Sequence, residues 1–254
     1  MQPLVDTTLI LLLAYLIVEF LLQPRRWFEQ RGRRTWAGYI KHGSVHYLSV
    51  CFLAAIFSFD SIASLRFQSV ILVLAAAHLF LDGRKYRMIR AGTATDSIWW
   101  FLTDQTLHSV AVITAALLLV KPAWGELTVQ LAHLRVHETK ILLTLTTYVA
   151  VIFGGGQVVR HATKGLLAKE PLIQGETQEE LRNAGMYIGW LERFLVLTVL
   201  ILESPAAVGL ILTAKSVVRY PELKSVRFAE YFLIGTLLSI TIAVLGGIVL
   251  LKVF

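Results

Sequence analysis

The chain has 254 residues, of which 56% are hydrophobic and only 16% are charged, and its formal net charge is +7. A soluble domain of this size would have too few polar side chains to cover its surface, so the composition excludes an ordinary water-soluble fold. It indicates an all-α protein with several transmembrane helices, because helices satisfy their own backbone hydrogen bonds in lipid.

Eight apolar stretches are predicted to form helices that cross the membrane, since about 20 apolar residues are needed to span roughly 30 Å of hydrocarbon. In chain order they are residues 4–22, 38–59, 68–81, 98–120, 141–158, 184–202, 206–218 and 228–251. The seventh is short and is also compatible with a re-entrant segment. We therefore expect a polytopic transmembrane helix bundle of about eight spans.

Lys and Arg residues are concentrated in alternate connections between these stretches. They follow the first, third and fifth stretches and lie between the seventh and the eighth. Because cytoplasmic loops are rich in Lys and Arg, this pattern predicts that these connections face the cytoplasm of a bacterial inner membrane. Topology and anionic headgroups then explain the net charge, so the bilayer is the expected partner and nucleic-acid binding is not expected.

The chain is predicted to have three parts. Residues 1–120 would form a four-helix membrane unit that carries most of the polar motifs. Residues 121–183 would form a connecting span and a cytoplasmic loop, because residues 164–183 are polar and include Pro171, Gly175 and several Glu and Gln residues. Residues 184–254 would form the C-terminal membrane helices.

Polar residues spaced four apart occur in each of the first four stretches. Such residues lie one above the other on one helix face, so each pair presents two side chains toward one point. The pairs are Glu19 and Gln23, His42 and His46, His78 and Asp82, and Asp104 and His108. Because successive spans alternate in direction, all four pairs are expected at a similar depth near the cytoplasmic boundary.

These pairs contain the donor atoms of a divalent-metal site. Imidazole nitrogen and carboxylate oxygen suit Zn, Mn or Fe, and ionisable groups within a span are costly unless they are paired or bound. The predicted ligands of one or two metals are His42, His46, His78, Asp82, Asp104 and His108, with Glu19 as a weaker member. A proton or ion path and a structural polar network are the alternatives, and Gln23 is expected to support a ligand.

Several motifs occur along the chain in a fixed order. The first half contains LIVEFLLQP with Trp27 shortly after it, then KHGSVHYL, AHLFLDGRK and LTDQTLH; the second half contains AGMYIGWLERFLVL, GLILTAKSVVRY and AEYFLIGTLLS. Together they resemble the bacterial membrane proteins grouped as the domain of unknown function 3307 family. The resemblance implies a membrane protein but no particular activity. Members typically show His and Asp where this chain has Tyr15 and Glu19; Glu can replace Asp as a ligand, whereas Tyr15 departs from the pattern.

The last spans carry a second set of polar residues. An ion pair of Glu192 with Lys215, or of Glu230 with Arg193, would satisfy charges inside the membrane, and we predict this structural role. Gly154, Gly155 and Gly156 are predicted to form a flexible end of the fifth span.

Three functions are compatible with the sequence. The first is a metal-dependent hydrolase in which Arg84 and Lys85 hold an anionic lipid headgroup or another small anionic ligand. The second is a transporter of metal ions or protons, and the third is a non-catalytic membrane scaffold or sensor. The sequence favours the hydrolase by a small margin, although it contains no nucleophile elbow, P-loop or HExxH motif to strengthen that interpretation.

Overall fold

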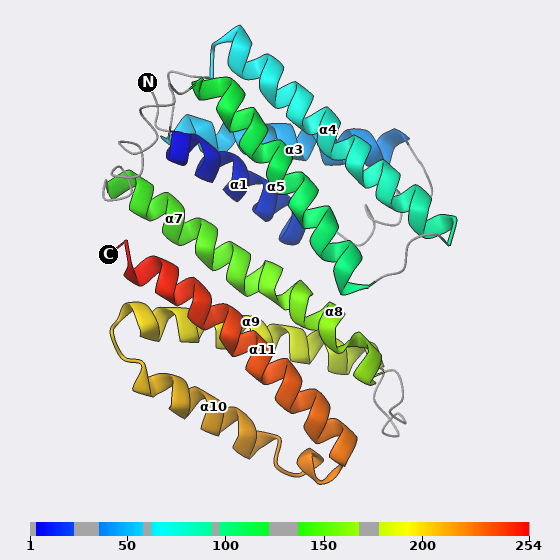
Figure 1. Ribbon diagram of the computed structural model, residues 1–254, viewed down its shortest axis with the longest axis vertical. Helices are drawn as coiled ribbons and strands as arrows, with labels where there is room; N and C mark the ends of the chain where they lie inside the picture. Colours follow the sequence, from blue (N-terminus) through cyan, green and yellow to red (C-terminus); the bar gives the residue numbers. More distant parts are fainter. Residues whose placement is uncertain are drawn as a thin grey trace. The chain divides into compact units, whose positions relative to one another are not determined.

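The computed structural model describes residues 4–22, 36–57, 62–92, 97–121, 137–167 and 178–253, which are helical throughout apart from short turns and caps. The all-α class is thereby confirmed for these ranges. The helical elements are α1 (Leu4–Phe20), α3 (Trp36–Phe57), α4 (Leu65–Arg90), α5 (Ile98–Val120), α7 (His137–Val149), η4 (Ala150–Gly154), α8 (Gly155–Leu167), α9 (Gln178–Ile201), α10 (Ala206–Val218), η5 (Glu222–Lys224) and α11 (Val226–Leu251) (Figure 1).

Five helices of the described part are long and apolar enough to cross a membrane. They are Gly38–Phe57, Leu65–Ile89, Ile98–Val120, Glu138–Lys164 and Val226–Leu251. These lengths indicate a multi-pass membrane protein, but the expected eight spans are more than they support. Two of the other apolar helices are short, with 17 residues in α1 and 13 in α10.

The chain divides into two compact units, residues 1–146 and residues 147–254. In the first unit α1 packs against α3, α3 against α4, α4 against α5, and α5 against α1, so the four helices close into a bundle (Figure 1). Every helix of this bundle therefore presents one face to a common interior. The three-part division at residues 120 and 183 stays a prediction, because compactness does not test what each part does.

Serine caps set where three of the helices begin. The hydroxyl oxygen of Ser64 accepts a hydrogen bond from the backbone N–H of Phe67 at 3.1 Å, and Ser97 and Ser225 occupy the same position before α5 and α11. Such caps satisfy one of the four backbone donors that a helix start leaves open. They set where α4 and α5 begin, and so how far along each helix its polar residues lie.

In the second unit α11 packs against both α8 and α9, and α10 packs against α9. The three glycines after Phe153 were predicted to form a flexible end of the fifth span. This prediction is wrong, because the helix continues through them. Gly154 closes the π-helical segment η4, Gly155 begins α8, and the helix continues to Leu167. Neighbouring helices enclose this point: Gly155 faces Ile242 of α11 and Gly156 faces Trp190 of α9.

One predicted ion pair is present in this unit. Lys215 Nζ of α10 donates a hydrogen bond to Glu192 Oε2 of α9 at 2.6 Å, and the two side chains are only 20% and 14% exposed. The same ammonium lies 5.4 Å from the centre of the Phe232 ring. The alternative pair, Glu230 with Arg193, is not formed, because Glu230 is exposed and Arg193 bonds to other groups.

Replacing Glu192 by Ala is expected to destabilise the protein by about 3 kcal/mol, because Lys215 would keep a partly buried charge without its partner. Thermal unfolding of the purified protein in detergent measures this effect. The double variant Glu192→Gln with Lys215→Met removes both charges and should recover most of the loss. If Glu192→Ala melts like the wild type and yet abolishes function, Glu192 acts in a functional site instead.

Candidate metal centre

The interior of the first unit contains a cluster of buried histidines and carboxylates at one level of the bundle. His42 and His46 come from α3, His78 and Asp82 from α4, and Asp104 and His108 from α5; all six are buried. Each helix contributes its pair on the inward face, as the four-residue spacing predicts. Gln23, the partner of Glu19 in the sequence pattern, lies outside the described residues.

Asp82 lies at the centre of this cluster. Its Oδ2 atom is 3.5 Å from Nε2 of His42 and 3.7 Å from Nε2 of His78, and its Oδ1 atom is 3.9 Å from Nε2 of His108. Nε2 of His42 is 2.9 Å from Nε2 of His78. One carboxylate therefore faces three imidazoles from three different helices.

The orientation of His108 is fixed by its own helix. Its Nδ1 atom lies 2.8 Å from the backbone carbonyl of Asp104, so Nδ1 carries the proton and donates to that oxygen. The other nitrogen, Nε2, faces Asp82 and bears the lone pair whenever the ring is neutral. Within the described residues this buried Nε2 has no hydrogen-bond partner. A histidine held through Nδ1 with an available Nε2 is the usual form of a metal-ligating imidazole.

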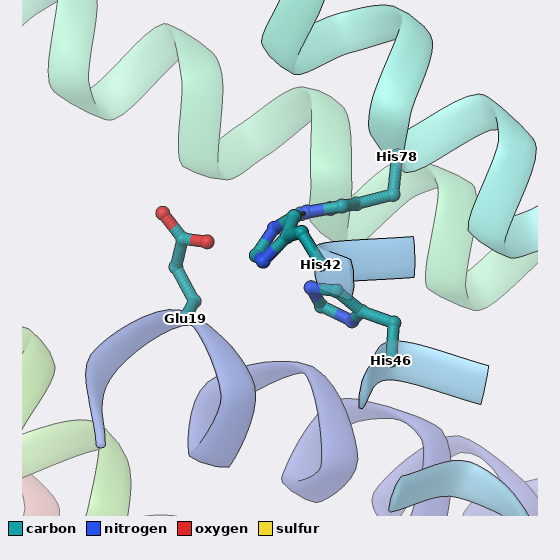
Figure 2. Close-up of side chains that lie close together, drawn as sticks. All are labelled: Glu19, His42, His46 and His78. Atoms are coloured by element: carbon teal, nitrogen blue, oxygen red, sulfur yellow. Dashed lines mark hydrogen bonds between the residues drawn. The ribbon is translucent and has the colours of Figure 1, made fainter. Parts of the chain in front are cut away.

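The donor atoms fall into two groups that could hold a metal ion. One group consists of Glu19, His42, His46 and His78, and the other of His78, Asp82 and His108; within each group the ligand atoms lie within 4.8 Å of one another. Figure 2 shows the first group, in which the Glu19 carboxylate from α1 faces the three imidazoles. His78 belongs to both groups and links them.

Asp104 is buried beside the cluster but belongs to neither group. Its Oδ2 atom accepts a hydrogen bond from Nζ of Lys85 at 2.6 Å, and the Lys85 side chain is 33% exposed. Two residues predicted for different roles, a metal ligand and a substrate-binding cation, thus form an ion pair with each other. Arg84, the other predicted substrate-binding residue, is exposed.

Tyr15 is part of the cluster, although no role was predicted for it from the sequence. Its buried ring stacks on His108, with centroids 5.3 Å apart and an angle of 18° between the planes, and it also approaches His46 and His78. Its hydroxyl donates a hydrogen bond to Oε1 of Gln105 at 2.9 Å. The signal for Tyr15 was its position four residues before Glu19, which puts both on one face of α1.

A small cavity of about 20 Å³ lies beside the histidines, on the side away from Glu19 and Asp82. Its walls include Leu11, Val50, Ile71 and Val112, together with the rings of Tyr15 and His46. This volume holds about one water molecule. The cluster is therefore bounded on this side mainly by apolar side chains.

The two compact units, the five membrane-length helices and the buried His and carboxylate cluster define a helical membrane protein with a polar centre in its first unit. Residues 7–145 match the family described as protein of unknown function (DUF3307), and the chain belongs to this family. The matched segment covers α3, α4 and α5 completely and α1 except for its first three residues, so the family assignment suggested by the sequence motifs is confirmed; the motifs of the second half lie outside the match. Neither a curated protein nor a solved structure matches the chain.

Proposed function

We propose that this chain is a metal-dependent hydrolase of the bacterial inner membrane that acts on a lipid or another anionic substrate at the cytoplasmic face. The observation that carries the proposal is the position of Asp82, whose carboxylate faces the Nε2 atoms of His42, His78 and His108 inside a bundle of apolar helices. Burying these groups together is costly unless a ligand or mutual pairing compensates.

The distances from Asp82 fit shared ligands better than hydrogen bonds, whereas the 2.9 Å between Nε2 of His42 and Nε2 of His78 is a normal hydrogen-bond length. Metal bonds to His and Asp are about 2.0 to 2.2 Å long, which puts neighbouring ligand atoms about 3 to 3.5 Å apart. The separations of 3.5 and 3.7 Å from Asp82 to His42 and His78 lie at or just beyond this range, and beyond normal hydrogen-bond length. Histidine and carboxylate donors together suit Zn, Mn or Fe.

A divalent metal in this place would supply a Lewis acid and an activated water at neutral pH. Glu19, which is partly exposed and faces the imidazoles, is suited to accept the proton of the attacking water. The water oxygen would form a bond to the phosphorus or carbonyl carbon of the ester. The ester oxygen would leave and take up a proton, so that one ester and one water give one acid and one alcohol.

The substrate would reach the site from the end of the bundle where Glu19 and Lys85 are accessible. Arg84 is exposed at this end and can attract an anionic headgroup without losing an internal partner. Lys85 could bind the same group only by sharing it with Asp104, its present partner. The basic connections predicted at this face would add a sequence-independent attraction for anionic lipid.

An ion path through the same cluster has less support. A permeating cation needs polar groups along its whole route, whereas the cavity beside the histidines is walled mainly by Leu11, Val50, Ile71 and Val112. A non-catalytic scaffold or sensor also has less support, because that role does not require the Asp82 carboxylate to face three imidazoles. Both alternatives remain open to the following test.

Metal analysis combined with chelation tests the proposal. The full chain, purified in detergent without chelator, should contain about one or two equivalents of a divalent metal. Hydrolysis of bis(p-nitrophenyl) phosphate or of anionic phospholipid should cease after chelation and return with Zn, Mn or Fe. A metal-free protein would contradict the metal centre. A metal-loaded protein that hydrolyses neither compound but moves the metal into vesicles would be a transporter.

A further inference from the structure

An open groove of about 460 Å³ lies in the second unit, along the last turns of α10 and the turn that follows them. Its lining residues are Leu212, Thr213, Ser216, Val217, Tyr220 and Leu223. None of them belongs to the unit that carries the His and carboxylate cluster. The volume lies in the range of pockets that hold small molecules, and it is far larger than the space of a single water.

The walls of this groove offer hydrocarbon and few donors. Thr213 Oγ1 donates a hydrogen bond to the backbone carbonyl of Gly209 at 2.8 Å, and Ser216 Oγ donates to that of Leu212 at 2.9 Å. Both hydroxyl protons are therefore used within α10. Val217 and Tyr220 are 67% and 69% exposed and add large apolar surface. The groove thus suits a hydrocarbon chain better than a polar molecule.

The described chain leaves this side of α10 uncovered. Figure 1 shows α10 at the edge of the unit beside α9, against which it packs, and none of its 13 residues is buried by the described residues. At one end the groove is closed by a hydrogen-bonded turn. There the backbone N–H of Tyr220 donates to the carbonyl of Val217 at 3.3 Å, and that of Leu223 donates to the carbonyl of Arg219 at 3.2 Å.

This turn carries positive charge. Arg219 directly precedes Tyr220, and Lys224, which is exposed, directly follows Leu223, so a basic residue adjoins each of these two lining residues. Residues 219–227 contain three basic residues and one glutamate, a formal net charge of +2. The C-terminal end of α10 contributes only about half a negative charge, so the surplus stays positive. The turn is also one of the basic connections predicted to face the cytoplasm.

We propose that the groove and its basic turn bind one anionic glycerophospholipid of the cytoplasmic leaflet. An acyl chain lies against Leu212, Val217 and Tyr220. The phosphate lies at the turn, between Arg219 and Lys224. The two features together select this ligand: a free phosphate gains nothing from the apolar groove, and a zwitterionic lipid brings no net charge to the basic turn. The proposal is independent of the hydrolase, because its residues all lie in the second unit.

Titration of defined lipids into the full chain tests this site. The delipidated protein in detergent is mixed with dioleoyl phosphatidylglycerol, dioleoyl phosphatidylcholine or glycerol phosphate, and the bound molecules are counted by native mass spectrometry. We expect one phosphatidylglycerol to bind first, and the other two compounds to bind at least about tenfold more weakly. A basic residue near a membrane surface contributes about fivefold to the binding of anionic lipid, so Arg219→Gln with Lys224→Gln should lower the affinity about 25-fold.

A groove-filling variant distinguishes this site from other places where anionic lipid binds. Thr213→Trp fills the groove from an exposed position and changes no charge. It should weaken phosphatidylglycerol binding at least about tenfold, because roughly two methylene groups or more lose their contact with the protein. The affinity that this variant removes belongs to the groove, even if the first unit also takes up an anionic lipid.

The matched controls are Ala214→Trp and Arg160→Gln. Ala214→Trp places the same ring at an exposed position of α10 outside the groove, and Arg160→Gln removes an exposed arginine of α8. Both should bind phosphatidylglycerol as the wild type does. The proposal is wrong if phosphatidylcholine or glycerol phosphate binds as tightly as phosphatidylglycerol. It is also wrong if Thr213→Trp binds like Ala214→Trp, because the basic turn would then attract anions without the groove.

Discussion

Replacing His78 and Asp82 together by Ala is expected to remove the metal from the purified protein, with a loss of affinity of at least about 100-fold. His78 belongs to both possible ligand groups, and Asp82 faces His42, His78 and His108. Each metal position would lose a ligand, whereas changes to groups that only support ligands already cost 10- to 100-fold. Metal content by mass spectrometry after dialysis measures the effect.

The matched control for this experiment is His161→Ala. His161 of α8 makes the same contact as His108, with Nδ1 2.8 Å from the backbone carbonyl four residues earlier, but it lies in the second unit. Its loss should leave the metal content unchanged. The helical circular dichroism spectrum checks that the double variant is folded. Metal that survives in the double variant would refute the proposed centre.

The cluster could be predicted from the sequence because the features that form it are local. A spacing of four residues fixes a common helix face, and the apolar runs on either side fix the depth of the pair. His42 with His46 and His78 with Asp82 follow from these two rules alone. The family resemblance added the order of the motifs, but the convergence itself is a consequence of helix geometry.

The hydrogen-bond and ion-pair partners within the cluster could not be predicted from the sequence, because they depend on which side chains extend from one helix to the next. Asp104 and His108 share a helix face, yet Asp104 pairs with Lys85 of α4, whose long side chain extends to it. Tyr15 stacks on His108 because α1 closes the bundle against α5. A sequence pattern identifies the helix face on which a residue lies. It does not show which of several neighbouring side chains will bond to that residue.

Helix ends and irregularities were also missed for a physical reason. The third span was predicted to end at Leu81, where the charged residues begin, but α4 continues to Arg90 because Arg, Lys and Met are good helix formers. The glycines at 154–156 suggested a helix end, whereas tertiary packing keeps the helix intact around Arg193. Hydropathy reports the solvent around a segment and not where its backbone hydrogen bonds stop.

Replacing Glu19 by Gln is expected to lower the rate of hydrolysis by about 10²- to 10⁴-fold, while most of the metal stays bound. The amide keeps the size of the side chain but cannot accept a proton from water, and loss of a positioned general base has this magnitude. His42, His46 and His78 remain to bind the metal, together with Asp82 and His108. Initial rates of bis(p-nitrophenyl) phosphate hydrolysis, measured beside metal content, test both statements.

The dependence of the rate on pH distinguishes a base from a ligand. A carboxylate base works only when it is ionised, so the wild-type rate should fall as pH decreases through its titration, and the Glu19→Gln variant should lack this dependence. Glu138→Gln replaces an exposed glutamate of the same unit and serves as the control, with wild-type rate and metal content. If Glu19→Gln loses metal in proportion to activity, Glu19 binds the metal and another group moves the proton. If the variant keeps both metal and activity, Glu19 has neither role, and the first unit must take its base from elsewhere in the cluster.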